Sequence, residues 1–289
     1  MRLVTGKGVP GPHPLGGAGA NTLRLGLYGR FSPHLSDDRD PSDYPPSADA
    51  YSLFVARSTA MGWLTDATRP EPRRLWGMNE AELEQASAAH PPLIGWFQVV
   101  VTEATGVDRL LPLQPFLACA GDVLDRLGVF ELQAAQLLLP PPDPSADDPP
   151  GVGALGHLAE TAGWFANCDR RRGTPVHFTI DGGQTIASAA PDIFRWTHEV
   201  VQDAHVFRCD RFDTSHDAST ILRGIADEPW VGPPSHRTTF SGTLVEWSLD
   251  ALGWTAAFLA HGCHRHGVET PLVLTATRTA DSAAGVPPP

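Results

Sequence analysis

The sequence predicts an α+β protein in which a unit of four antiparallel strands and two helices occurs twice in tandem. Three observations support this prediction. Segments with the period-two alternation of strands are interspersed with segments of helical periodicity in both halves of the chain. A Pro-Pro pair precedes the third strand of each half, at residues 91–92 and again at 233–234. Residues 140–153 (PPPDPSADDPPGVG) separate the halves and are too rich in Pro and Asp for a regular element.

The first half opens with a strand, because Leu23, Leu25 and Leu27 alternate with more polar residues. Ser47 is a suitable N-cap for the helix that follows, and Asn79 with Glu82 forms a capping box for a second helix. The remaining elements follow from runs of branched and aromatic residues or from a Pro start and a Gly stop. We predict strands at 21–31, 73–78, 93–104 and 129–139, and helices at 47–64, 79–89 and 113–128.

The second half repeats this order after a short helix around residues 155–167. Its first long helix is predicted to start at Pro191 and Asp192, since Pro is favoured in a first helical turn. Its last long helix is predicted to stop at Gly267. We predict strands at 175–181, 205–212, 238–248 and 270–278, and helices at 190–204, 217–226 and 250–267.

Apart from a short helix, both halves therefore read strand, helix, strand, strand, helix, strand, which is the βαββαβ order of ferredoxin-like folds. The predicted fold class is a tandem duplication of this unit. The alternative is that the apparent repeat arises from the way the chain is divided, since many α+β chains can be divided into two similar series of elements. We expect the helix-free faces of the two sheets to face each other as an α+β barrel with a pocket between them; the alternative is that both faces are solvated. The predicted divisions are a flexible Gly/Pro leader (1–20), two repeats (21–139 and 154–279), a linker (140–153) and a flexible tail (280–289).

Composition excludes several classes of protein. The formal net charge is −12 without an offsetting basic block, which disfavours nucleic acid as a partner. No apolar run approaches the ~20 residues of a membrane span, and residues 1–20 lack a secretory signal, so we expect a cytoplasmic protein without a membrane partner. The four cysteines form no C-x-x-C pair and are expected to be reduced thiols. Lys7 is the only lysine and lies in the leader, which excludes a lysine-anchored cofactor.

Residues 261–266 contain three histidines and one cysteine, which raises the question of a metal site. Helical spacing places Cys263 in the buried stripe of the last helix as a small core side chain. His261 and His264 are expected to leave that stripe and to face solvent near the C-terminus of the helix, where they complement its dipole. A zinc site needs ligands from at least two elements, and no second pair is evident, so no metal is predicted.

Strand alternation identifies the polar side chains that would line the predicted pocket. His177 and Asp181 are the candidates for general acid and base chemistry, because an imidazole and a carboxylate lie on one face of the same strand. The remaining candidates would bind a polar ligand or its anionic group; they are Arg24, Tyr28, Arg30, Gln98, Gln133, Arg208, Asp210 and Glu246.

The leading functional hypothesis is a small-molecule binding or tailoring enzyme that needs no cofactor. Its reaction would be a cyclisation, an isomerisation or a cofactor-independent oxidation in a pocket between the repeats. The alternative is a non-enzymatic partner or scaffold protein, and a further alternative is a haem or metal-dependent enzyme that uses His198, His205 or the 261–266 cluster. A small-molecule ligand is the expected partner, with a homodimer left open, and the sequence does not decide whether the chain is an enzyme.

Overall fold

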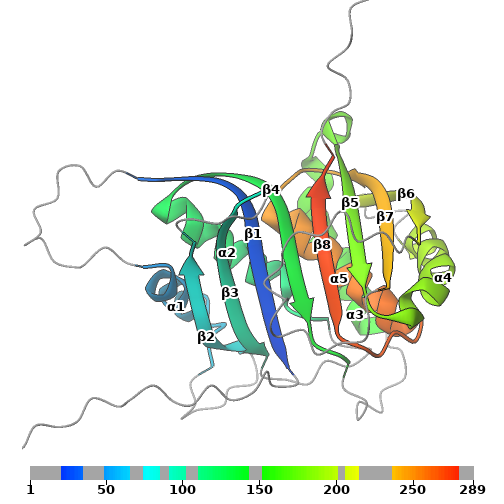
Figure 1. The fold of residues 1–289 in the computed structure, drawn as a ribbon, viewed down its shortest axis with the longest axis horizontal. Helices are drawn as coiled ribbons and strands as arrows, with labels where there is room; N and C mark the ends of the chain where they lie inside the picture. The colour runs from blue at the N-terminus through cyan, green and yellow to red at the C-terminus, as the bar shows by residue number, and fades with distance from the viewer. Residues whose placement is uncertain are drawn as a thin grey trace, which may run out of the picture.

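The computed structural model describes residues 21–34, 49–65, 74–84, 91–101, 110–142, 152–200, 206–214 and 236–279. Within these ranges the strands form one antiparallel sheet, and Figure 1 shows helices packed behind it. The α+β class and the antiparallel pairing are therefore confirmed. The strands are β1 (Thr22–Pro33), β2 (Trp76–Leu83), β3 (Leu93–Val101), β4 (Gly128–Leu139), β5 (Thr174–Asp181), β6 (Phe207–Asp213), β7 (Arg237–Leu244) and β8 (Leu272–Arg278).

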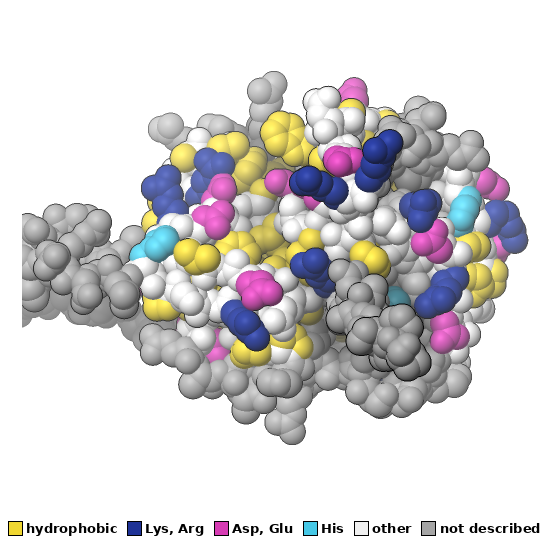
Figure 2. Space-filling view, turned by 90° about the horizontal axis from the view of Figure 1, so that it is seen from above, with side chains coloured by type: hydrophobic (Ala, Val, Ile, Leu, Met, Phe, Trp, Pro, Cys, Tyr) yellow, Lys and Arg dark blue, Asp and Glu magenta, His cyan; other side chains and the backbone are white. Residues whose placement is uncertain are grey.

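The long helices fall between the strands in the predicted order, whereas neither of the short helices predicted at 79–89 and 217–226 is among the described elements. The described helices are α1 (Ala50–Ala60), α2 (Leu113–Leu127), α3 (Val152–Ala162), α4 (Gln184–Val200) and α5 (Leu249–Arg265), with 3-10 turns η1 (Gly163–Asn167) and η2 (Arg170–Arg172) after α3. No helix in the described ranges is long and apolar enough to cross a membrane. Side chains of both charge signs are interspersed over the face of the molecule seen in Figure 2.

The sheet order is β2-β3-β1-β4-β8-β5-β7-β6. In each half the first strand lies between the third and the fourth, and β4 pairs with β8, from Ala134 opposite Thr277 to Leu139 opposite Leu272. The expectation that two sheets face each other is therefore wrong, because the halves meet edge to edge. An unpaired strand edge exposes backbone N–H and C=O groups, and the β4–β8 pairing satisfies these groups in both halves.

The core lies between the sheet and the helices, and α5 is its centre. Leu249 and all residues of α5 from Ala251 to Cys263 are buried, since α2, α3 and α4 each contact this helix. The predicted burial of Cys263 is confirmed. The predicted exposure of His261 is wrong, because the ring of Trp196 on α4 covers it and leaves 5% of the residue exposed. His264, which was also predicted to face solvent, is partly buried.

Several element boundaries also differ from the prediction. Residues 79–83 belong to β2, because pairing with β3 outweighs the helix propensity of this segment. Asp49 is the N-cap of α1 and accepts a hydrogen bond from the backbone N–H of Ser52 at 2.7 Å, whereas the predicted cap, Ser47, lies outside the described residues. The helix expected to start at Pro191 starts at Gln184, so that Pro191 lies inside α4.

Some predicted features lie outside the described residues. These are the leader, the tail, the short helix at 217–226, residues 143–151 of the linker, and His205.

Candidate functional site

The helix-free face of the sheet carries a polar array at its centre. Alternation along β5 turns Val176, Phe178 and Ile180 into the core and leaves His177 and Thr179 half-buried on the other face. Register then places the residues opposite these two on the same face of the neighbouring strands. His177 is flanked by Thr277 of β8 and Ser241 of β7, and Thr179 is flanked by Thr275 and Thr239.

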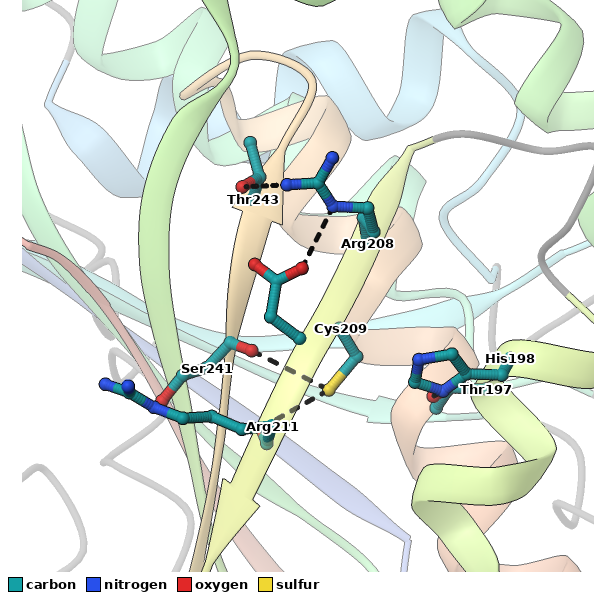
Figure 3. A network of polar contacts seen from close by, with 8 residues as sticks. Thr197, His198, Arg208, Cys209, Arg211, Ser241 and Thr243 are labelled. Carbon is teal, nitrogen blue, oxygen red and sulfur yellow. Dashed lines mark hydrogen bonds and ion pairs between the residues drawn. The ribbon is translucent and has the colours of Figure 1, made fainter.

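His177, Ser241 and Arg211 form a continuous row across β5, β7 and β6. Nδ1 of His177 lies 2.9 Å from Oγ of Ser241, and Ser241 is in turn the register partner of Arg211. Figure 3 shows Arg211 and Ser241 on one side of β6, and His198 of α4 on the other side. We refer to His177, Ser241 and Arg211 as the row site.

Burial and a neighbouring cation determine the charge of His177. Desolvation lowers the pKa of this imidazole below its ordinary value, and the positive charge of Arg211 lowers it further. The imidazole is therefore neutral at neutral pH. A neutral ring with its proton on Nε2 accepts the hydroxyl proton of Ser241 at Nδ1.

Arg211 differs from its neighbours in its partners. Arg208 is paired with Asp210 at 3.0 Å, and Arg237 with Asp181 at 3.4 Å. Among the described residues, no carboxylate lies within ion-pair distance of Arg211, which is exposed. A cation thus remains available beside a hydroxyl and an imidazole.

A second row of polar contacts lies next to the row site. The hydroxyls of Thr179 and Thr239 are 2.9 Å apart, and the amide of Gln136 donates to the hydroxyl of Thr275 at 3.2 Å. Gln136 is 3% exposed, and its Oε1 atom has no hydrogen-bond partner within the described part of the chain. A buried acceptor of this kind calls for a donor, such as a water or a ligand group.

Asp181 does not join the row site. Its carboxylate is 7% exposed and accepts hydrogen bonds from the backbone N–H of His236 at 3.1 Å and from Arg237 at 3.4 Å. Four residues of extended strand separate Asp181 from His177, a distance of roughly 13 Å. The two predicted catalytic residues therefore share a face but cannot act on the same proton.

Four of the predicted ligand-binding residues lie on β1 and β3. The Arg24 guanidinium lies 5.1 Å from the ring centroid of Trp96, and Gln98 is its register partner. Tyr28 is fully buried against Ala134. Arg30 forms an exposed ion pair with Glu131 at 3.9 Å.

The other predicted residues are more scattered. Gln133 lies where the β1–β4 register shifts. Arg208 lies on the edge strand β6 (Figure 3), and its guanidinium is hydrogen-bonded to Asp210 of the same strand. Glu246 lies beyond the end of β7, where it accepts a hydrogen bond from Ser248 at 2.6 Å. The sheet therefore brings His177 together with residues that were not predicted, rather than with the predicted set.

The thiols and the histidine-rich stretch offer little chemistry. Burial raises the pKa of Cys119 to about 11 and that of Cys209 and Cys263 to about 12, which leaves these thiols protonated and unreactive. Within the described ranges, no three His, Cys, Asp or Glu side chains are arranged to hold a metal ion.

Comparisons with protein-family models, with curated proteins and with solved structures each return no match.

Sequence reasoning missed Ser241 and Arg211. Both lie on predicted strands, and alternation assigns each of them a face. Their proximity to His177 depends on which strands pair and in which register, and one residue of register shift would turn Ser241 away. The bulge in β6 between Cys209 and Arg211 has no local signal in the sequence.

Proposed function

We propose that this chain binds a small molecule through an oxyanion group, such as a carboxylate or a phosphate, at the row site on the helix-free face of the sheet. The observation that carries this proposal is Arg211, a cation without a carboxylate partner among the described residues, next to the hydroxyl of Ser241. This binding site lies on the face of a single sheet, so the proposal does not depend on the pocket that was expected between two facing sheets.

The chemistry of the three side chains is complementary to an oxyanion. A guanidinium presents parallel N–H donors that match the two oxygens of a carboxylate or phosphate. The Ser241 hydroxyl can donate its one proton to the oxyanion when the His177 ring carries its own proton on Nδ1 and donates it to Oγ of Ser241. The neutral His177 ring adds a donor or acceptor for a second polar group of the ligand.

A tailoring reaction at this site would use His177 as the base. A neutral imidazole at neutral pH can remove a proton from a bound substrate, which the proposed isomerisation or cyclisation requires. Asp181 is not part of this proposal, since Arg237 and a backbone N–H already occupy its carboxylate. A purely non-enzymatic partner protein remains the second candidate, favoured by the hydrogen-bonded pairing of Thr179 with Thr239, which also stabilises an ordinary sheet.

The test is a titration of the full chain with inorganic sulfate, in which the NMR chemical shifts of the His177 ring report binding. A saturable shift is expected in the native chain. Arg211→Met is expected to weaken binding by about ten-fold or more, a loss of at least ~1.4 kcal/mol. Arg172→Met, at an arginine exposed elsewhere on the molecule, serves as the matched control and should bind like the native chain. A shift that does not saturate, or that is the same in Arg211→Met, overturns the proposal.

We also propose that the two halves arose by duplication of one ferredoxin-like unit. Support comes from the strand order, since each half has its first strand between its third and fourth, with a helix after its first and third strands. A separately expressed second half, residues 154–279, should then fold with a cooperative unfolding transition. An unfolded product would count against an autonomous ancestral unit.

A further inference from the structure

The row site places a hydroxyl between a base and a cation. Ser241 has His177 as its register partner on β5 and Arg211 as its register partner on β6. Neighbouring antiparallel strands are only ~4.8 Å apart, so the three side chains occupy adjacent positions on one face. A nucleophile, the base that activates it and a cation that stabilises negative charge are the parts that acyl transfer requires.

The contact between His177 and Ser241 has the geometry of an activated nucleophile. The Nδ1–Oγ distance of 2.9 Å lies within the range in which a serine proton passes to imidazole. His177 and Ser241 are both only partly buried, so a solute can reach them from the helix-free side.

A second hydroxyl–imidazole pair in the molecule lacks these properties. Oγ1 of Thr197 lies 3.5 Å from Nδ1 of His198, but this hydroxyl donates to the carbonyl of Phe194 at 2.7 Å. Thr197 is also buried. The row site differs from this pair because its hydroxyl is only partly buried and has the imidazole as its hydrogen-bond partner.

Thr239 provides a further internal comparison. This residue lies two positions before Ser241 on the same face of β7, and its hydroxyl contacts the hydroxyl of Thr179 at 2.9 Å. Thr239 therefore occupies an equivalent position on the strand, but its partner is a hydroxyl. A hydroxyl is too weak a base to activate Thr239 as an imidazole activates Ser241. Thr239 is therefore the matched control residue for any claim about Ser241.

We propose that Ser241 is a covalent nucleophile for acyl esters, with His177 as its general base and Arg211 as the cation that stabilises the oxyanion. This proposal rests on the proposed function, because an oxyanion bound at rest occupies the place of the negative oxygen formed during the reaction. It extends that function from binding to hydrolysis or acyl transfer.

The reaction balances with water as the only co-reactant. Oγ of Ser241 attacks the carbonyl carbon of the ester while its proton passes to Nδ1 of His177, and the carbonyl oxygen becomes negative beside Arg211. The bond to the alcohol then breaks, and the alcohol leaves with the proton held by His177. Water attacks the acyl-serine by the same steps, which releases the carboxylic acid and restores the Ser241 hydroxyl.

The test is reaction of the full chain with a fluorophosphonate, a reagent that forms a phosphonyl ester with activated serines. One adduct is expected, at Ser241, with none in Ser241→Ala. His177→Gln is expected to slow labelling by about 10²–10⁴-fold, the usual contribution of a general base. Thr239→Ala should react like the native chain.

A second measurement separates base catalysis from a structural role of His177. The labelling rate should rise with pH as the His177 ring loses its proton, and its midpoint should lie below 6.5, since burial and Arg211 both lower the pKa of this ring. A p-nitrophenyl ester should give a burst of nitrophenol with the acyl group on Ser241. Adducts elsewhere, equal labelling in His177→Gln, or a rate without this pH dependence would each overturn the proposal.

The sulfate titration distinguishes failure of this proposal from failure of the proposed function. Sulfate binding that depends on Arg211, without any adduct at Ser241, leaves a binding site and removes the nucleophile. An adduct at Ser241 without sulfate binding supports the nucleophile and overturns oxyanion binding at rest.

Discussion

Nε1 of Trp254 on α5 donates a hydrogen bond to the backbone carbonyl of Leu158 on α3, at 3.0 Å. Both groups are buried, and the bond joins α3 to α5, the central helix of the core. An indole N–H that is removed from water needs such a partner.

The first prediction is that Trp254→Phe destabilises the protein by ~1–3 kcal/mol. Phenylalanine keeps most of the ring contacts but leaves the Leu158 carbonyl buried without its donor. Urea unfolding at pH 7 measures the change. The control is Trp164→Phe, at a tryptophan that is 73% exposed, which should change the free energy of unfolding by less than ~0.5 kcal/mol.

The second prediction concerns two glycines that both lie in helices. A Cβ at Gly262 of α5 would lie 2.6 Å from Cζ3 of Trp196, whereas a Cβ at Gly156 of α3 would meet nothing within 4 Å. Gly262→Ala should therefore cost ~1–3 kcal/mol through overpacking against α4. Gly156→Ala should stabilise by roughly 0.5–1 kcal/mol, because alanine loses less conformational entropy in a helix. Equal effects of the two substitutions would contradict the close packing of α4 on α5.

The amphipathic elements could be predicted because one local pattern determined each of them. The segment of α2 carries its apolar residues at helical spacing, starts near Pro115 and ends at Gly128, and the structure places α2 at Leu113–Leu127. The helix predicted at residues 79–89 was wrong at 79–83 because a contact between strands outweighed the local pattern. The Glu and Ala residues of this segment favour a helix, but the edge of β3 was available for pairing.

The candidate site was less predictable because it depends on contacts between strands. His177 was identified from alternation alone, and its position on the helix-free face agrees with that reading. Its partners are 34 and 64 residues away in the chain, at Arg211 and Ser241. The exposure of His261 was mispredicted for a related reason, since a spacing pattern does not reveal that α4 packs beside α5 and covers this position.

The third prediction is that acid destabilises the protein through His264. Burial, followed by the charge of His261, lowers the pKa of His264 to about 4 in the folded chain, compared with 6.5 for a free ring. The unfolded chain therefore binds a proton that the folded chain does not, so stability falls as the pH drops from about 6.5 toward about 4. The total loss is on the order of 3 kcal/mol.

Urea unfolding at several pH values between 4 and 7 measures this loss. His264→Leu should flatten the pH dependence, since leucine cannot take up a proton. His157→Leu, at an exposed histidine of α3, should retain the native pH dependence. An unchanged slope in His264→Leu would show that other groups bind the acid-linked proton.

The fourth prediction concerns the electrostatic coupling within the row site. Desolvation is the larger cause of the lowered pKa of His177, and the charge of Arg211 is the smaller cause. Arg211→Met should therefore raise the pKa of His177, but only part of the way to 6.5. NMR titration of the His177 ring measures this pKa directly, and Arg172→Met controls for a general change in net charge. A pKa that does not move in Arg211→Met would place the guanidinium too far from the ring to stabilise charge at Ser241, and a complete return to 6.5 would show that burial of the imidazole contributes nothing.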